Sequence, residues 1–348
     1  MKKLRIGYYG YSSDFSHPAD RRRIAFWAKD RGHDLVSNES SNVDLIVLSE
    51  RANLRFLNRQ KPKAPVIFDL IDAYFIRDKL LNDSLRGTLK VATKQISGPP
   101  NLFSSMVKEL ANAASAVICS STEQQALIQN RFGNVHAILD SHDEFPLIKF
   151  SKRSPSESPG LLWEGMAATL SGLKQLEQPI IFSQHHEKLR VNILTDIIYF
   201  RALGKYAPAR SEALLQKQIG KISAPFKITP WTITNLVDMA LVSSFSVIPI
   251  NMRSPLQVLK PENRLLIMWR LGLPCLTSAT PSYLRVAGEA GVETVCSNES
   301  EWIEKIDQVI SDDAFAEFVV NSGQKYLKNH HNREMLLKKW DRAVESVL

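Results

Sequence analysis

The sequence predicts an α/β protein built from two doubly wound domains, each with a parallel sheet covered by helices on both faces. Short apolar runs of buried-strand type alternate with helical segments along the chain, which is the pattern of a parallel sheet. The alternation stops at a polar stretch with two prolines and a glycine, residues 151–160, and then restarts. A length of 348 residues also suits two domains of roughly 100–200 residues each.

The N-terminal half starts with an apolar strand at Leu4–Gly10 and a helix at Ala19–Arg31 that carries Phe26 and Trp27. Later apolar runs are short and rich in Val, Ile and Leu, as in strands buried on both faces. The expected strands are Asp44–Ser49, Pro65–Leu70, Ala116–Ser120 and Val135–Asp140, and the expected helices are Ser104–Ala114 and Thr122–Arg131.

The C-terminal half repeats the alternation and ends in helices. The expected strands are Leu161–Glu164, Val191–Thr195, Phe226–Ile228, Phe245–Ile250, Pro274–Ser278 and Thr294–Ser297, and the closing helices are Glu299–Ile310, Asp313–Leu327 and Arg333–Val347. We therefore expect domains at 1–155 and 156–330, with 331–348 a helix that could cross back to the first domain. Two such domains would place the carboxyl ends of two sheets at a cleft, where ligands bind.

Composition narrows the setting. The chain is 44% hydrophobic and 23% charged, as in soluble globular proteins, and no run approaches the roughly 18 apolar residues that span a membrane. The three cysteines, Cys119, Cys275 and Cys296, are widely spaced, which speaks against a disulfide framework or a structural zinc site. We expect a cytoplasmic protein.

The positive charge is concentrated at the N-terminal end. Residues 1–100 hold 18 Lys and Arg against 11 Asp and Glu, so that +7 of the net +8 lies there. Such a field suits an anionic membrane surface, a phosphorylated acceptor or another polyanion, while a well-solvated basic surface is the plainer interpretation. The chain shows no nucleic-acid-binding motif to accompany the charge, so nucleic acid is not an expected partner.

The most specific stretch lies at 259–278. A loop ending in Lys260-Pro261-Glu262-Asn263 leads into a helix that carries Arg264 and stops at Gly272, before a buried strand. Free backbone N–H groups at a helix start, with Lys260 and Arg264 beside them, suit a diphosphate; alternatively Asn263 simply caps the helix and the cations are solvated. The dinucleotide-binding, P-loop and α/β-hydrolase signatures are all missing from the sequence.

This stretch resembles the donor-site motif of GT-B glycosyltransferases, especially glycosyltransferase family 4. Lys-Pro-x-Asn-Lys/Arg-Leu, a helix, Gly-Leu-Pro and a Pro-x-Tyr loop are matched here through Pro281-Ser282-Tyr283. Glu109–Ser121 and Trp163-Glu164-Gly165 agree in order with other segments of that family. The resemblance implies the GT-B architecture, in which two Rossmann-like domains face a central cleft.

The resemblance also implies roles. Lys260, Asn263 and Arg264 would hold the diphosphate of a nucleotide sugar, and Trp231 would stack on the base, although a core tryptophan is an equal alternative. Thr195 follows a strand whose loop usually faces the donor. One position departs from the family: where retaining members carry a second Glu that accepts hydrogen bonds from the donor, this chain has Ile267, which cannot.

The catalytic candidates lie in the N-terminal domain. Asp72 follows the strand Pro65–Leu70, at the edge of the sheet where cleft residues lie, and could act as the base of an inverting transfer; alternatively it caps the next helix. Asp14 is a second candidate on the first loop, where Gly10, Tyr11 and Ser12 are expected to contact substrate.

The expected function is therefore transfer of a sugar from a nucleoside-diphosphate donor to a glycan, glycolipid or phosphorylated acceptor, in bacterial surface polysaccharide synthesis. No cofactor or metal is expected, since cations and helix termini hold the diphosphate in GT-B enzymes. Attachment to the inner face of the membrane through the basic domain is an accompanying expectation. The alternatives are a catalytically silent GT-B-like glycan- or partner-binding protein, which Ile267 keeps open, and a nucleotide-sugar epimerase-type isomerase.

Overall fold

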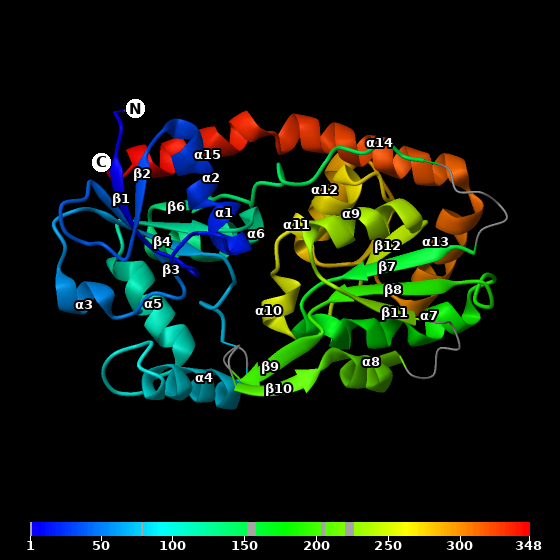
Figure 1. Ribbon diagram of the computed structural model, residues 1–348, viewed down its shortest axis with the longest axis horizontal. Coiled ribbons are helices and arrows are strands. Elements are labelled where there is room, and N and C mark those ends of the chain that lie inside the picture. The colour runs from blue at the N-terminus through cyan, green and yellow to red at the C-terminus, as the bar shows by residue number, and fades with distance from the viewer. Residues whose placement is uncertain (1, 78, 152–157, 203–205, 220–225) are drawn as a thin grey trace. The chain divides into compact units, whose positions relative to one another are not determined.

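The computed structural model describes residues 2–77, 79–151, 158–202, 206–219 and 226–348. The chain divides into two compact units (Figure 1): unit 1 comprises Met1–His142, Ser254–Pro261 and Asn332–Leu348, and unit 2 comprises Asp143–Arg253 and Glu262–His331. Most of the expected interdomain linker, residues 152–157, lies outside the described residues. No described helix has the length and apolarity that a membrane crossing requires.

Unit 1 is a six-stranded parallel sheet in the order β2-β1-β3-β4-β5-β6 with helices on both faces (Figure 1). Its strands are β1 (Arg5–Tyr9), β2 (Asp34–Ser37), β3 (Leu45–Ser49), β4 (Val66–Leu70), β5 (Ala116–Cys119) and β6 (Val135–Ala137). Its helices are α1 (Pro18–Arg21), α2 (Ile24–Arg31), α3 (Phe56–Gln60), α4 (Leu80–Ala92), α5 (Phe103–Ala113), α6 (Thr122–Phe132), α10 (Pro255–Val258) and α15 (Arg333–Glu345).

Alternation along the strands divides the core of unit 1 between the two faces of its sheet. Leu45 and Val47 of β3 pack with Trp27 and Trp340 on one face, whereas Ile46 and Leu48 pack on the other. All five residues of β3 are buried. The continuous apolar runs in the sequence therefore belong to strands covered on both faces, as predicted.

Unit 2 has a parallel sheet in the order β11-β8-β7-β12-β13-β14 and a separate antiparallel hairpin, β9-β10. The strands are β7 (Gly160–Glu164), β8 (Arg190–Thr195), β9 (Ile198–Ala202), β10 (Tyr206–Arg210), β11 (Phe226–Pro230), β12 (Phe245–Ile248), β13 (Cys275–Ser278) and β14 (Val295–Cys296). The helices are η1 (Ala167–Leu176, 3₁₀), α7 (Glu177–Phe182), α8 (Ser211–Ile219), α9 (Ile233–Val242), α11 (Asn263–Arg270), α12 (Pro281–Ala290), α13 (Glu299–Ser311) and α14 (Asp313–His330).

The predicted fold class is confirmed, because each unit is a doubly wound α/β sheet. In each sheet, successive strands are added first on one side of the starting strand and then on its other side, so the strand order reverses once. In unit 1 this point lies between β1 and β3, and in unit 2 between β7 and β12. Ligands of doubly wound sheets bind outside the carboxyl ends of the strands at this point, so it is where a site is sought.

The expected helix Ala19–Arg31 is wrong in one respect, because it is two helices that break at Arg22 and Arg23. Arg23 has φ −121° and ψ −113°, which is not helical, and it is completely buried. Its guanidinium donates to Asp69 at 2.6 Å and to Asp140 at 3.0 Å. The break turns Arg23 into the sheet, so this arginine is part of the core rather than of a basic surface.

Candidate functional site

Three residues that follow neighbouring strands gather at the carboxyl edge of the sheet in unit 1. Tyr11 follows β1, Glu50 follows β3 and Asp72 follows β4, and these strands lie side by side. Tyr11 and Glu50 therefore flank the point where the sheet reverses. The Tyr11 hydroxyl donates a hydrogen bond to Glu50 Oε1 at 2.5 Å, which joins the two strand ends.

Glu50 is the most perturbed acid of this cluster. Its side chain is buried, and Oε2 has no hydrogen-bond partner among the residues that the structure describes. Burial, with the negative charge of Asp72 added, raises the pKa of Glu50 to about 8. A carboxyl group with a pKa near neutrality can both hold and release a proton under physiological conditions. Sequence reasoning missed this residue, although its place directly after a buried strand was the available signal.

Asp72 is paired with a cation. Lys260 Nζ lies 3.5 Å from Asp72 Oδ1, and both side chains are partly exposed. The alternative that Asp72 caps the next helix is wrong, because the backbone turns at Asp72–Tyr74 and the next helix, α4, begins at Leu80 with Lys79 as its N-cap. Lys260 belongs to unit 1, whereas Asn263 and Arg264 belong to unit 2. The Lys-Pro-Glu-Asn run is thus divided between the two units.

The first loop is organised by a carboxylate that the sequence did not single out. Asp20 is completely buried and accepts hydrogen bonds from the backbone N–H groups of Tyr11 and Ser12, at 2.9 Å each, and from the Tyr8 hydroxyl at 2.7 Å. A side chain at Gly10 would collide with Asp20 and with the Tyr8 ring, so glycine permits this close approach. The N–H groups expected to reach substrate are committed to Asp20.

Asp14 lies on the outer part of the same loop and is exposed. Its carboxylate accepts hydrogen bonds from the Ser16 hydroxyl at 2.8 Å and the Ser16 backbone N–H at 3.1 Å. These bonds lower the pKa of Asp14. A carboxylate with a lowered pKa is a weaker base, so Asp14 is a poorer candidate for proton transfer than Glu50, whose pKa is raised.

Unit 2 gathers a second cluster at the end of β7, beside its own reversal point. Glu164 Oε1 accepts from Arg264 Nε at 2.8 Å, and Glu164 Oε2 accepts from the Trp231 indole N–H at 3.0 Å. Arg264 also donates to the Glu164 carbonyl oxygen and lies over the Trp163 ring, 5.4 Å from its centroid. The carboxylate thus aligns a guanidinium and an indole next to each other.

The remaining predicted binding residues of unit 2 lie around this cluster. Thr195 ends β8, and its carbonyl oxygen accepts from the Trp231 backbone N–H at 3.1 Å. The Thr195 side chain is buried, and its hydroxyl has no partner in the described part of the chain. Asn263 is the first residue of α11 and Glu262 is the N-cap, so the alternative that Asn263 caps this helix is wrong. Trp231 is half-buried rather than a core residue.

Ile267, at the position of the family's second glutamate, lies on the buried side of α11 and is 4% exposed. No described group of three or more His, Cys, Asp or Glu side chains is placed to hold a metal ion. Glu164, Arg264 and Trp231 form a polar cluster in unit 2 that can bind an anion and a flat ring.

The sequence matches no protein-family model and no curated protein sequence. Its fold resembles HepE from Anabaena, solved with UDP and glucose, with a TM-score of 0.64 at 12% identity over 99% of this chain and 100% of that chain. WaaG, a glycosyltransferase involved in lipopolysaccharide biosynthesis, gives 0.57 at 12% identity over 98% and 99%. TarM gives a TM-score of 0.62 at 12% identity over 86% of this chain. The match covers 54% of TarM, so this chain spans about half of its length.

These likenesses confirm the GT-B fold, with its two Rossmann-like domains. At 12% identity they establish architecture rather than activity. Membership of glycosyltransferase family 4 stays a prediction from the motifs at 259–283.

Proposed function

We propose that this protein is a glycosyltransferase that moves a sugar from a nucleoside-diphosphate donor to a glycan or glycolipid acceptor, in bacterial surface polysaccharide synthesis. The observation that carries the proposal is the Glu164–Arg264–Trp231 cluster at the reversal point of unit 2. A guanidinium suits a diphosphate and an indole suits a nucleobase. The fold supports it, since HepE has the same architecture and was solved with UDP and glucose.

Glu164 takes two parts in this proposal. In the protein without donor it holds Arg264 and Trp231 in place. When a diphosphate binds, Arg264 exchanges Glu164 for phosphate oxygens, and the released carboxylate accepts hydrogen bonds from donor hydroxyls. Glu164 would thereby supply the acceptor group that Ile267 lacks. The diphosphate is neutralised by cations in this scheme, so we propose binding without a metal ion.

Unit 1 would receive the acceptor. Asp72, at the end of β4, is placed to take the proton from an acceptor hydroxyl in an inverting transfer, with Lys260 orienting its carboxylate. A retaining transfer needs no protein base, and Asp72 would then bind acceptor or sugar. Glu50 lies next to Asp72, whose negative charge adds to the effect of burial in raising the pKa of Glu50 to about 8.

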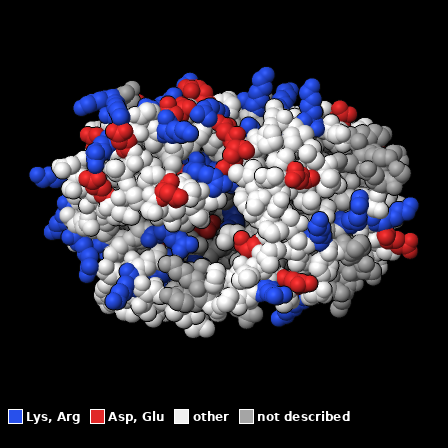
Figure 2. All heavy atoms as spheres, viewed as in Figure 1, with Lys and Arg blue, Asp and Glu red and all other residues white. Residues whose placement is uncertain are grey.

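We further propose that unit 1 meets an anionic surface, either the inner face of the cytoplasmic membrane or a phosphorylated acceptor. Residues 1–100 carry +7 of the net charge, and Figure 2 shows Lys and Arg side chains along the outer edge of unit 1, on the left. Arg23 does not belong to this surface, because it is buried in its ion pairs with Asp69 and Asp140, and Arg31 pairs with Asp341 at 2.7 Å.

Calorimetric titration with UDP, GDP, ADP, dTDP and CMP, with and without Mg²⁺, tests the donor site. We expect one diphosphate to bind, equally well without metal, and Arg264→Met to weaken it about tenfold, or roughly 1.4 kcal/mol. Arg190→Met is the matched control, because Arg190 is exposed at the opposite end of β8 and should leave affinity unchanged. Glu164→Gln removes the negative charge that competes with the diphosphate for Arg264, so it should preserve diphosphate affinity. It thereby distinguishes loss of the Glu164–Arg264 ion pair from loss of the arginine that binds the diphosphate.

Unchanged affinity in Arg264→Met, with a loss of thermal stability, would make Arg264 a structural partner of Glu164 and overturn the assignment. If none of the nucleotides binds the wild-type protein, the buried Ile267 marks a lost donor pocket. A catalytically silent glycan-binding protein would then be the better description.

A further inference from the structure

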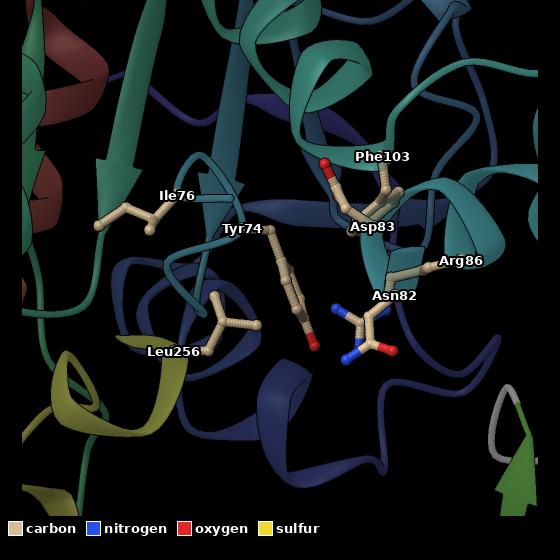
Figure 3. A pocket seen from close by; sticks show the side chains of 7 residues that line it. All are labelled: Tyr74, Ile76, Asn82, Asp83, Arg86, Phe103 and Leu256. Carbon is tan, nitrogen blue, oxygen red and sulfur yellow. The ribbon is translucent and has the colours of Figure 1, made fainter. Parts of the chain in front are cut away.

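Unit 1 contains a cavity of about 170 Å³, and none of the candidate site residues described above lines it. It lies between the turn after β4, α4, the start of α5 and α10, and is lined by Tyr74, Ile76, Asn82, Asp83, Arg86, Phe103 and Leu256 (Figure 3). One buried water needs roughly 10–15 Å³ on the same measure, so the cavity has room for a group of many atoms.

The lining combines flat apolar surface with one cation. Arg86 lies over both aromatic rings, with its guanidinium carbon 4.6 Å from the Tyr74 centroid and 5.5 Å from that of Phe103. In Figure 3 the Tyr74 hydroxyl points toward the Arg86 and Asn82 side chains, while Ile76 and Leu256 lie on the other side of the Tyr74 ring. Apolar side chains next to a few polar ones suit a sugar ring, which has apolar C–H faces and a polar edge.

The lining holds one cation, Arg86, and one acid, Asp83. Within the described chain, no carboxylate lies in ion-pair contact with Arg86. Asp83, the acid in the lining, is committed elsewhere, because it accepts from the Ser104 backbone N–H at 2.9 Å and from its hydroxyl at 2.6 Å. Lys90 adds a second cation one turn along α4, with Nζ 4.8 Å from the Phe103 centroid. A half-buried guanidinium without a carboxylate partner is a ready site for an anion.

The cavity adjoins the proposed reaction centre. Tyr74 follows Asp72 by two residues, and its backbone N–H donates to the Asp72 carbonyl oxygen at 2.7 Å. Burial and the charge of Asp72 both raise the pKa of the Tyr74 hydroxyl, so the phenol stays protonated beside the acid.

We propose that this cavity binds an anionic sugar of the acceptor, a residue with a carboxylate or a phosphate ester, with its ring against the apolar part of the lining and its anion on Arg86. The interpretation of this cavity as an acceptor site rests on the proposed glycosyltransferase function. The binding itself depends only on unit 1 and can be measured without donor.

The test is calorimetric titration of the full-length protein with methyl glucuronide, glucose 6-phosphate, neutral methyl glucoside and inorganic phosphate. At least one anionic sugar should bind at least tenfold more tightly than the neutral glucoside and than inorganic phosphate. Which of the two anionic sugars binds better identifies the anion. Arg86→Gln should weaken this binding at least tenfold, whereas Arg59→Gln, an exposed arginine on α3, should leave it unchanged.

Backbone amide shifts of the wild-type protein give a second readout that needs no variant: the anionic sugar should perturb α4 and Phe103. Equal affinity for neutral and anionic sugars, unchanged affinity in Arg86→Gln or perturbation confined to other elements would overturn the proposal. Nucleotide titration distinguishes the two hypotheses. Sugar binding without any nucleotide binding would contradict the proposed glycosyltransferase function and support the sugar site. Nucleotide binding without sugar binding would support the glycosyltransferase function and contradict the sugar site.

Discussion

At the scale of single residues, Glu50 makes stability depend on pH. Its pKa is raised from an ordinary 4.5 to about 8, so the folded protein binds more protons than the unfolded chain between these values. The free energy of unfolding should therefore fall as pH rises from 5 to 8, by up to roughly 1.4 kcal/mol per unit from this group. Glu50→Gln should remove this fall and be more stable than wild type at pH 8. Urea unfolding at pH 5, 6.5 and 8 measures both.

The control is Glu187→Gln, an exposed glutamate of unit 2, which should keep the wild-type pH dependence. Burial also lowers the pKa of the neighbouring Lys90 to about 8, but this group acts in the opposite direction and above pH 8. Because burial also lowers the pKa of His17, His33 and His136, the contribution of Glu50 is read as the difference between wild type and Glu50→Gln. Parallel pH profiles for wild type and Glu50→Gln would mean that Glu50 is ionised in the folded protein.

The sequence predicted where functional side chains would gather better than which ones would touch. Asp72, Thr195 and Tyr11 were placed at strand ends from the pattern of apolar runs, and the structure has them there. The contacts of Glu50 and Glu164 depend on strand order, because Tyr11 meets Glu50 only where β1 lies next to β3. Strand order does not follow from local pattern, so the contacts of these two acids could not be predicted.

At the scale of elements, the break between α1 and α2 shows a tertiary contact overriding a helical pattern. Arg23 leaves the helix to pair with Asp69 inside the protein, where both side chains are fully buried. Asp69→Asn should cost about 3–5 kcal/mol, since it removes the fully buried carboxylate of the two that compensate the charge of Arg23. The double variant Arg23→Met/Asp69→Leu should regain much of this loss, because an apolar pair replaces the ion pair. Urea unfolding of wild type and the two variants measures the loss and its recovery.

The exposed pair of Lys3 and Asp34 is the matched control, with side chains 62% and 56% exposed and a separation of 2.9 Å. Lys3→Met should change stability by less than about 1 kcal/mol, because solvent screens the interaction. A comparably small effect of Asp69→Asn would show that the buried pair does not hold α1 and α2 to β4.

The elements that the sequence missed lack a pattern of buried apolar residues. β2 is an edge strand with no buried residue, and the β9-β10 hairpin stands apart from both main sheets. α4 carries Leu80, Leu81 and Leu85 exposed to solvent, so its apolar residues do not mark its buried side. Strands buried on both faces were found correctly, since packing leaves their signal uninterrupted.

At the scale of the whole molecule, unit 1 is assembled from three segments distant in the sequence, and the last one closes its core. α15 packs on α2, where Trp340 stacks with Trp27 at 6.1 Å between centroids, and Asp341 accepts from the Trp27 indole N–H at 2.7 Å (Figure 1). Trp340→Ala should therefore destabilise unit 1 by about 3–5 kcal/mol, as for other buried tryptophans.

Because α15 belongs to unit 1 alone, the loss should be confined to that unit. Hydrogen exchange followed by mass spectrometry should show faster exchange of β1 and β5 in Trp340→Ala, while β7 and β12 keep wild-type protection. Lys338→Ala, an exposed position on the same helix, is the control and should exchange like wild type. Equal loss of protection in both units would show that the molecule unfolds as one cooperative body. Unchanged protection in β1 would show that α15 does not unfold together with the sheet of unit 1.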